Sequence, residues 1–200
     1  YIMVKKYELH KKIIVGTAQF LDNYGINRKL KNINLKKKIN IIESSLKNKF
    51  IYFDTSNSYS EYSNVFNNIH DHQIILKLNP EKDIINYDLW VKKIVNKYLK
   101  IFKVKSFYAI MIHNEEVLNN INFLTFYKSL LSLKQKKITK RIGISIYSFQ
   151  GILKKIKLYK FDLIQCPFSL IDQRLLENNL LNDLKKNNIE IHIRSIFLQG

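Results

Sequence analysis

The feature that most constrains the fold of this 200-residue chain is a regular alternation of short apolar runs with longer segments of helical spacing. The first residues of the apolar runs are separated by 37, 24, 33, 34, 21 and 27 residues, which is the pitch of strand–helix units. The runs predict strands at 13–16, 50–54, 74–78, 107–112, 141–144, 162–165 and 189–195. The segments between them predict helices at 34–47, 89–102, 116–133, 148–157 and 175–186, with a shorter helix after Tyr59. We therefore expect an α/β fold around a parallel sheet.

Two parallel architectures are compatible with this alternation, a doubly wound open sheet and a (β/α)₈ barrel. The first strand runs into the segment 16–19, which lacks the glycine-rich turn of a dinucleotide-binding open sheet. Polar side chains instead follow or end five successive strands, at Asp54, Lys77, His113, Ser145 and Gln165. A barrel brings such strand ends together at one mouth, so the pattern favours a TIM barrel. About seven of its eight units are present, and no linker divides residues 1–200, so we expect a single incomplete barrel domain.

The formal charge of +18 suggests nucleic acid or an anionic membrane as a partner, but the composition argues against both. The chain holds 30 Lys, 31 Ile and 22 Asn against only four Arg, five Gly and two Pro, a pattern that A/T-rich codons explain. Arginine, the residue best suited to bidentate phosphate and base contacts, is the scarce cation. The lysines are spread over nearly every segment, so we expect solvated helix faces rather than a binding surface.

Several other classes of protein are also disfavoured. No apolar run is long enough for a transmembrane helix, and the N-terminal segment has no apolar core of a signal peptide. Cys166 is the only cysteine, which excludes an internal disulfide, and we expect it to be buried packing. The segment 70–72 (His-Asp-His) has too few neighbouring ligands for a metal site. We expect a soluble cytoplasmic protein without a metal.

Four of the polar residues at or after the strand ends are chemically matched. Asp54 and Tyr59 lie five residues apart across a strand end and its loop. Lys77 lies within an apolar run and must reach a carboxylate or a polar mouth, because an unpaired buried ammonium is costly. His113 follows the fourth strand. An ammonium near a tyrosine hydroxyl stabilises the tyrosinate, so the four residues can form a proton-transfer relay.

Each of these residues alone also has a structural explanation. An aspartate at a strand end commonly caps a helix or loop, one tyrosine among 12 usually packs in the core, and a single histidine is usually a satisfied polar group. The functional interpretation therefore depends on finding four compatible residues at successive strand ends.

With these residues in order along the chain, the sequence resembles the aldo-keto reductases. The resemblance includes the Gly16-Thr17 turn, the Asp54-Thr55 pair followed by Tyr59, and Lys77 on the third strand. It continues through His113-Asn114, the Gly-Ile-Ser segment 143–145, the Gln165-containing sixth strand and the final segment 191–200, which is similar to a bacterial branch. The resemblance covers nearly the whole chain, so it is more specific than any one motif.

The resemblance implies reversible reduction of an aldehyde or ketone with NADP(H). It implies that Tyr59 protonates the carbonyl oxygen, that Lys77 and Asp54 tune Tyr59, and that His113 orients the carbonyl. Residues expected to contact the cofactor are Gly16, Thr17, Ser145, Gln165, Arg194 and Ser195. The expected partner is a small carbonyl substrate, with no nucleic acid and no membrane.

The sequence also departs from the family pattern. Ser60 and Glu61 directly follow Tyr59 where relatives have a glycine, and Ile146 stands where many relatives have asparagine. The eighth strand and its phosphate-binding loops are not in the sequence, so we expect the 200-residue chain alone to bind NADPH weakly or not at all. The alternatives are an inactive truncated barrel that binds a nucleotide or a partner protein and, less favoured, a basic nucleic-acid-binding protein.

Overall fold

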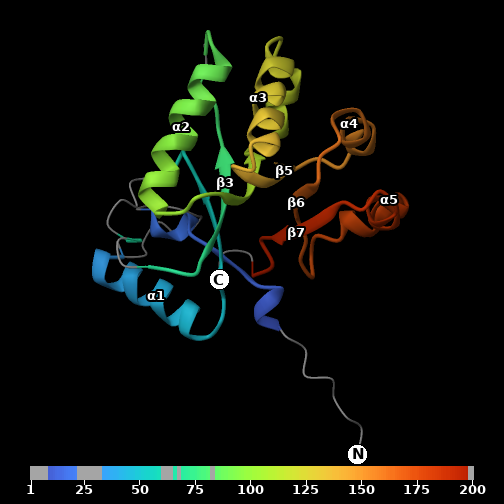
Figure 1. Ribbon diagram of the computed structural model, residues 1–200. Coiled ribbons are helices and arrows are strands. Elements are labelled where there is room, and N and C mark those ends of the chain that lie inside the picture. The colour runs from blue at the N-terminus through green and yellow to red at the C-terminus, as the bar shows by residue number, and fades with distance from the viewer. Residues whose placement is uncertain (1–8, 22–32, 60–64, 67–68, 82–83, 198–200) are drawn as a thin grey trace, which may run out of the picture.

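The computed structural model describes residues 9–21, 33–59, 65–66, 69–81 and 84–197. Within them, seven strands form one sheet in the order β1-β2-β3-β4-β5-β6-β7, and every neighbouring pair is parallel. The helices follow one another in chain order around the outside of the curled sheet (Figure 1). The structure is an incomplete (β/α)₈ barrel, which confirms the fold predicted from the alternation.

The strands and helices lie close to the predicted positions. The strands are β1 (Ile14–Gly16), β2 (Tyr52–Ser56), β3 (Gln73–Leu78), β4 (Phe107–Ile112), β5 (Thr139–Ser145), β6 (Leu163–Pro167) and β7 (Glu190–Arg194). The α-helices are α1 (Leu35–Lys47), α2 (Tyr87–Phe102), α3 (Phe123–Gln135), α4 (Ile152–Tyr159) and α5 (Leu180–Lys186). Short 3₁₀ segments lie at η1 (Leu9–Lys11), η2 (Ala18–Phe20), η3 (Glu115–Asn119) and η4 (Arg174–Asn179).

Two separate cores stabilise this arrangement, as expected for a barrel. The larger one packs the outer faces of the strands against the helices and includes Phe53, Ile110 and the buried face of α2. The smaller one fills the inside of the sheet with Ile75, Ala109, Met111 and Leu163. Strands buried on both faces explain the near-continuous apolar runs of the sequence.

The inner core fixes where the polar residues point. Side chains two residues apart on a strand share a face. A residue two positions after an inner-core residue therefore also points inward, one layer nearer the C-terminal ends of the strands. Lys77 follows Ile75, His113 follows Met111 and Gln165 follows Leu163 in this way. The parallel register aligns Gly16 with Asp54 and Ser145 with Gln165 at the same end.

Helix starts follow local capping chemistry. The side chain of Asn34 accepts a hydrogen bond from the backbone N–H of Lys37 at 2.9 Å and so starts α1. Asn86 accepts one from the N–H of Leu89 at 3.0 Å and starts α2, two residues earlier than the predicted helix boundary. Neither cap depends on contacts between distant parts of the chain.

Two predicted helices are interrupted in the structure. The predicted helix 116–133 consists of η3 and then α3, because Asn114 caps the first turn and the chain leaves helical geometry at Asn120. The predicted helix 175–186 consists of η4 and α5, with left-handed backbone at Asn178 and Asn179. The short helix expected after Tyr59 falls largely outside the described residues.

Candidate functional site

A cavity of about 570 Å³ opens at the C-terminal ends of the strands. All ten residues that the sequence singled out line it: Gly16, Thr17, Asp54, Tyr59, Lys77, His113, Ser145, Gln165, Arg194 and Ser195. They come from the seven strands or from the loops that follow them. The geometry brings the candidates together, while their roles stay predictions.

Lys77 and Asp54 form a buried ion pair at the base of the cavity. The Lys77 ammonium lies 3.1 Å from each carboxylate oxygen of Asp54, and the two side chains are 7% and 12% exposed. Gln165 connects to both partners, because its Nε2 donates to Asp54 Oδ2 at 2.7 Å and its Oε1 accepts from Lys77 at 3.2 Å. Further hydrogen bonds help to offset the cost of burying an ion pair, and Gln165 supplies two of them here.

Tyr59 and His113 lie directly beside this ion pair. The Lys77 ammonium is 5.7 Å from the centre of the Tyr59 ring. The Tyr59 and His113 rings meet edge to face, with their centres 5.8 Å apart. The cavity therefore holds a phenol, an imidazole, an ammonium and a carboxylate in mutual proximity, which is a set that can move a proton.

Burial holds His113 in its neutral form. Desolvation, followed by the nearby charge of Lys77, lowers the pKa of His113 to about 4 despite the opposing effect of Asp54. Its Nδ1 lies 2.9 Å from Ser56 Oγ, and Ser56 Oγ also accepts the backbone N–H of Ser58 at 3.1 Å. Near pH 7 the imidazole is therefore uncharged and hydrogen-bonded on one side.

The cavity also offers groups suited to a carboxamide. The hydroxyl of Ser145 is buried, and Gln165 keeps one amide hydrogen and one oxygen lone pair beyond its two bonds to the ion pair. The backbone N–H and the hydroxyl of Thr17 both donate to the Asp54 carbonyl oxygen, which fixes the first loop beside Gly16. A carboxamide needs both donors and acceptors, so these residues fit the nicotinamide end of a dinucleotide cofactor.

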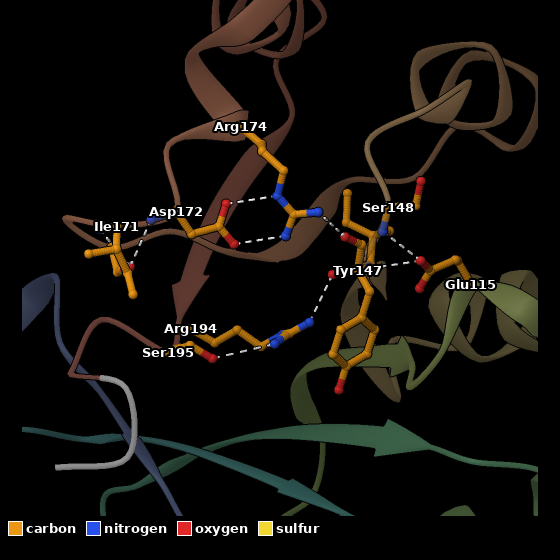
Figure 2. Close-up of polar contacts among 10 residues, drawn as sticks. Glu115, Tyr147, Ser148, Ile171, Asp172, Arg174, Arg194 and Ser195 are labelled. Carbon is orange, nitrogen blue, oxygen red and sulfur yellow. Dashed lines mark hydrogen bonds and ion pairs between the residues drawn. The ribbon is translucent and has the colours of Figure 1, made fainter.

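Arg194 contributes a second cation to the cavity (Figure 2). Its guanidinium donates to the Ile146 carbonyl oxygen at 3.0 Å and to Ser195 Oγ at 3.4 Å. The central guanidinium carbon lies 3.9 Å from the centre of the Tyr147 ring, so the two groups stack. Ser195 adopts left-handed backbone at φ 62° directly after β7, where the strand was predicted to continue.

Two further candidate signals lie outside this cavity. His72 is buried and its Nε2 lies 3.0 Å from the Phe102 carbonyl oxygen, as a packed polar group would. Within the described ranges, no group of three or more His, Cys, Asp or Glu could hold a metal ion. Cys166 is buried, as predicted, and burial raises the pKa of its thiol to about 12.

None of the described helices has the length and apolar character to cross a membrane.

Fold and site together define an incomplete (β/α)₈ barrel with a tyrosine, a histidine and a lysine–aspartate ion pair in one cavity at its mouth. A model of the aldo/keto reductase family matches residues 12–200, and the chain therefore belongs to this family of oxidoreductases. This confirms the family resemblance identified in the sequence. No curated protein sequence matches the chain.

Solved structures show the same fold at low sequence identity. The aldo-keto reductase AKR11C1 from Bacillus halodurans, in its holo form, superposes with a TM-score of 0.73 at 15% identity, over 94% of this chain and 63% of that one. The glycerol dehydrogenase AKR11B4 from Gluconobacter oxydans gives 0.70 at 16% identity, over 94% and 61%. An aldo/keto reductase from Brucella melitensis gives 0.64 at 17% identity, over 92% and 67%. The chain thus spans about two thirds of the length of these relatives.

Sequence reasoning did not identify every residue of the cavity region. Ser56 and Ser58 contact the imidazole of His113, and Tyr147 stacks on Arg194. Ser56 lies two residues after Asp54, so a polar side chain in this position was a usable signal. The position of Tyr147 depends on contacts with distant segments and gives no signal in the sequence.

Proposed function

We propose that the chain carries the active site of an NADP(H)-dependent carbonyl reductase. The observation that supports this most strongly is the Lys77–Asp54 ion pair beside the rings of Tyr59 and His113 in one cavity. An aldehyde or ketone is reduced to an alcohol by adding a hydride to carbon and a proton to oxygen. When bound, the nicotinamide cofactor supplies the hydride and leaves in its oxidised form.

In this proposal Tyr59 is the proton donor. Its hydroxyl gives a proton to the carbonyl oxygen, and the neighbouring ammonium of Lys77 stabilises the phenolate that remains. Asp54 and Gln165 hold Lys77 in place and charged. Solvent then returns a proton to Tyr59 through the open mouth of the cavity.

His113 orients the carbonyl in its neutral form. In this proposal the Ser56 hydroxyl, 2.9 Å from Nδ1, donates to that nitrogen, which leaves the single ring proton on Nε2. An Nε2–H hydrogen bond to the carbonyl oxygen withdraws electron density from the carbon that receives the hydride. A protonated imidazole would compete with Tyr59 as proton donor, which the low pKa of His113 prevents.

Five of the remaining predicted residues would hold the cofactor. Ser145 and Gln165 would bind the nicotinamide carboxamide, and Gly16 and Thr17 would form the wall beside it. Ser195 would complete this wall after the seventh strand, and Arg194 lines the cavity next to it. We also propose that the cofactor is NADP(H) and that the substrate is a small carbonyl compound.

The test is a single hydroxyl deletion at Tyr59, made in the protein in its natural form, because residues 1–200 by themselves are expected to bind NADPH weakly or not at all. We expect the Tyr59→Phe variant to lose about 10²- to 10⁴-fold in the rate of aldehyde-dependent NADPH oxidation, the usual contribution of a positioned acid. Tyr52→Phe removes a hydroxyl from the opposite end of the barrel and is the matched control. Equal rates in the two variants would overturn the role of Tyr59.

A further inference from the structure

Arg194 is a cation in the cavity that no carboxylate of the described residues pairs with. The described part of the cavity wall holds the cations Lys77 and Arg194 and the carboxylate of Asp54. Asp54 is already paired with Lys77 and Gln165. Among the described residues, no acid lies within ion-pair distance of Arg194, whose protein contacts are with neutral groups.

The other acids of this region are engaged elsewhere (Figure 2). Both oxygens of Asp172 accept from the Arg174 guanidinium at 2.8 Å. One oxygen of Glu115 accepts the backbone N–H groups of Tyr147 and Ser148, each at 2.8 Å. These contacts hold carboxylates near the cavity wall without placing one against Arg194.

The plane of the Arg194 guanidinium is fixed before any ligand arrives. Its face stacks on Tyr147, and one of its nitrogens is tied to the Ile146 carbonyl oxygen. Tyr147 is itself held by the Glu115 contact to its N–H and by Arg174, which donates to its carbonyl oxygen at 3.3 Å. A guanidinium held in this way loses little conformational entropy when it binds an oxyanion.

An unpaired, partly buried guanidinium is costly to the folded chain. Proteins tolerate such an energetic cost mainly at functional sites, where a ligand can supply the missing charge. Two Nη hydrogens of Arg194 have no acceptor among the described residues, which leaves donors for a carboxylate or phosphate group. The positive charge of Arg194 also lowers the pKa of His113, which indicates that the guanidinium lies near the proposed reaction centre.

We infer that Arg194 is an anion-binding residue that receives a carboxylate or phosphate group carried by the carbonyl substrate. The substrate class is therefore an aldehyde or ketone that bears an oxyanion. This inference rests on the proposed function and deepens it, since it names the kind of substrate that the cavity selects. The phosphates of the cofactor carry the same chemistry, and the experiments below separate the two sources.

The first experiment measures binding without turnover. Benzoate and benzamide, which differ in charge, are titrated by calorimetry into the full chain and its variants. We expect benzoate to bind at least tenfold more weakly to Arg194→Gln than to the unchanged protein, and benzamide to show no such dependence. Lys36→Gln, which removes an exposed positive charge, is the matched control and leaves benzoate affinity within twofold. Equal benzoate affinity in the unchanged protein and Arg194→Gln would overturn the inference.

The second experiment compares 4-carboxybenzaldehyde with its methyl ester as substrates. We expect Arg194→Gln to lower kcat/KM at least tenfold for the acid and less than threefold for the ester. The Kd of NADPH, measured by fluorescence, stays within threefold. If Arg194→Gln instead weakens the binding of NADPH and lowers kcat/KM equally for both substrates, Arg194 binds an anionic group of the cofactor and the inference is wrong.

The two proposals can fail separately. If the unchanged protein reduces neither aldehyde while benzoate binding still depends on Arg194, the reductase proposal fails and the anion site holds. If both aldehydes are reduced with Tyr59-dependent rates that Arg194→Gln leaves unchanged, the reductase proposal holds and the anion site fails.

Discussion

Acidification should destabilise the chain through His113. The unfolded imidazole takes up a proton near its ordinary pKa of 6.5, whereas the folded one does so only at about 4. The unfolded state therefore binds more protons between these values, and the free energy of unfolding falls as the pH decreases from about 6.5 to about 4. One pKa unit corresponds to about 1.4 kcal/mol, so His113 accounts for a loss of about 3 kcal/mol at most.

A comparison with a variant that lacks His113 isolates this contribution from the other titrating groups. Burial also lowers the pKa of His72, which destabilises the folded chain at low pH in the same way, so the pH dependence of the unchanged protein does not isolate His113. In the His113→Gln variant the contribution of His113 to the pH dependence of the free energy of unfolding disappears, while that of His72 stays. Burial, Lys77 and Arg194 lower the pKa of His113, and Asp54 raises it, so all four contributions are contained in the measured difference.

Urea unfolding at pH 7, 6, 5 and 4 provides the measurement, with the fluorescence of Trp90, the only tryptophan, as the signal. We expect the unchanged protein to lose up to about 3 kcal/mol more than His113→Gln between pH 7 and pH 4. Parallel stability curves for the two proteins across this range would refute the claim that the folded chain holds His113 neutral.

Three further predictions concern the packing and the reactivity of single side chains. Gly143→Ala should destabilise the chain by about 1–3 kcal/mol in urea unfolding, because the added Cβ would lie 2.6 Å from Leu163 Cγ and 2.8 Å from its carbonyl oxygen; an unchanged midpoint contradicts this. Cys166 should resist iodoacetamide at pH 8 in the folded chain and react in urea, since burial raises the pKa of its thiol to about 12. Ser56→Ala should shift the ¹⁵N signals of the His113 ring toward the other tautomer and lower kcat several-fold, while unchanged ring signals would show that Ser56 does not set the tautomer.

The strand pattern made most of the fold predictable from the sequence. Strands such as β3 and β6 are buried on both faces, so their apolar runs stand out against the helical segments. The inner positions could not be separated from the outer ones by hydropathy, because Ile74 and Ile75 are equally apolar and face different cores. The breaks between η3 and α3 and between η4 and α5 depend on local turns of asparagine, which the helical periodicity does not report.

The site residues were predictable where the chemistry of a side chain matched its position at the end of a strand. Lys77 within an apolar run required a partner, and Asp54 at the neighbouring strand end is that partner in the structure. The contact of Ser56 with His113 joins residues 57 positions apart, and the stacking of Tyr147 on Arg194 joins the segment after β5 to the end of β7. Such contacts depend on the curling of the sheet, so no local sequence pattern indicates them.

The most direct test of the central claim follows one deuterium atom. The protein in its natural form is supplied with NADPH deuterated at nicotinamide C4 and with 4-carboxybenzaldehyde, and the alcohol is analysed by mass spectrometry. The proposed function predicts an alcohol with deuterium on the former carbonyl carbon, formed by the unchanged protein and at least about 100-fold more slowly by Tyr59→Phe. An alcohol without deuterium, or equal rates of deuterated product from the two proteins, would contradict it.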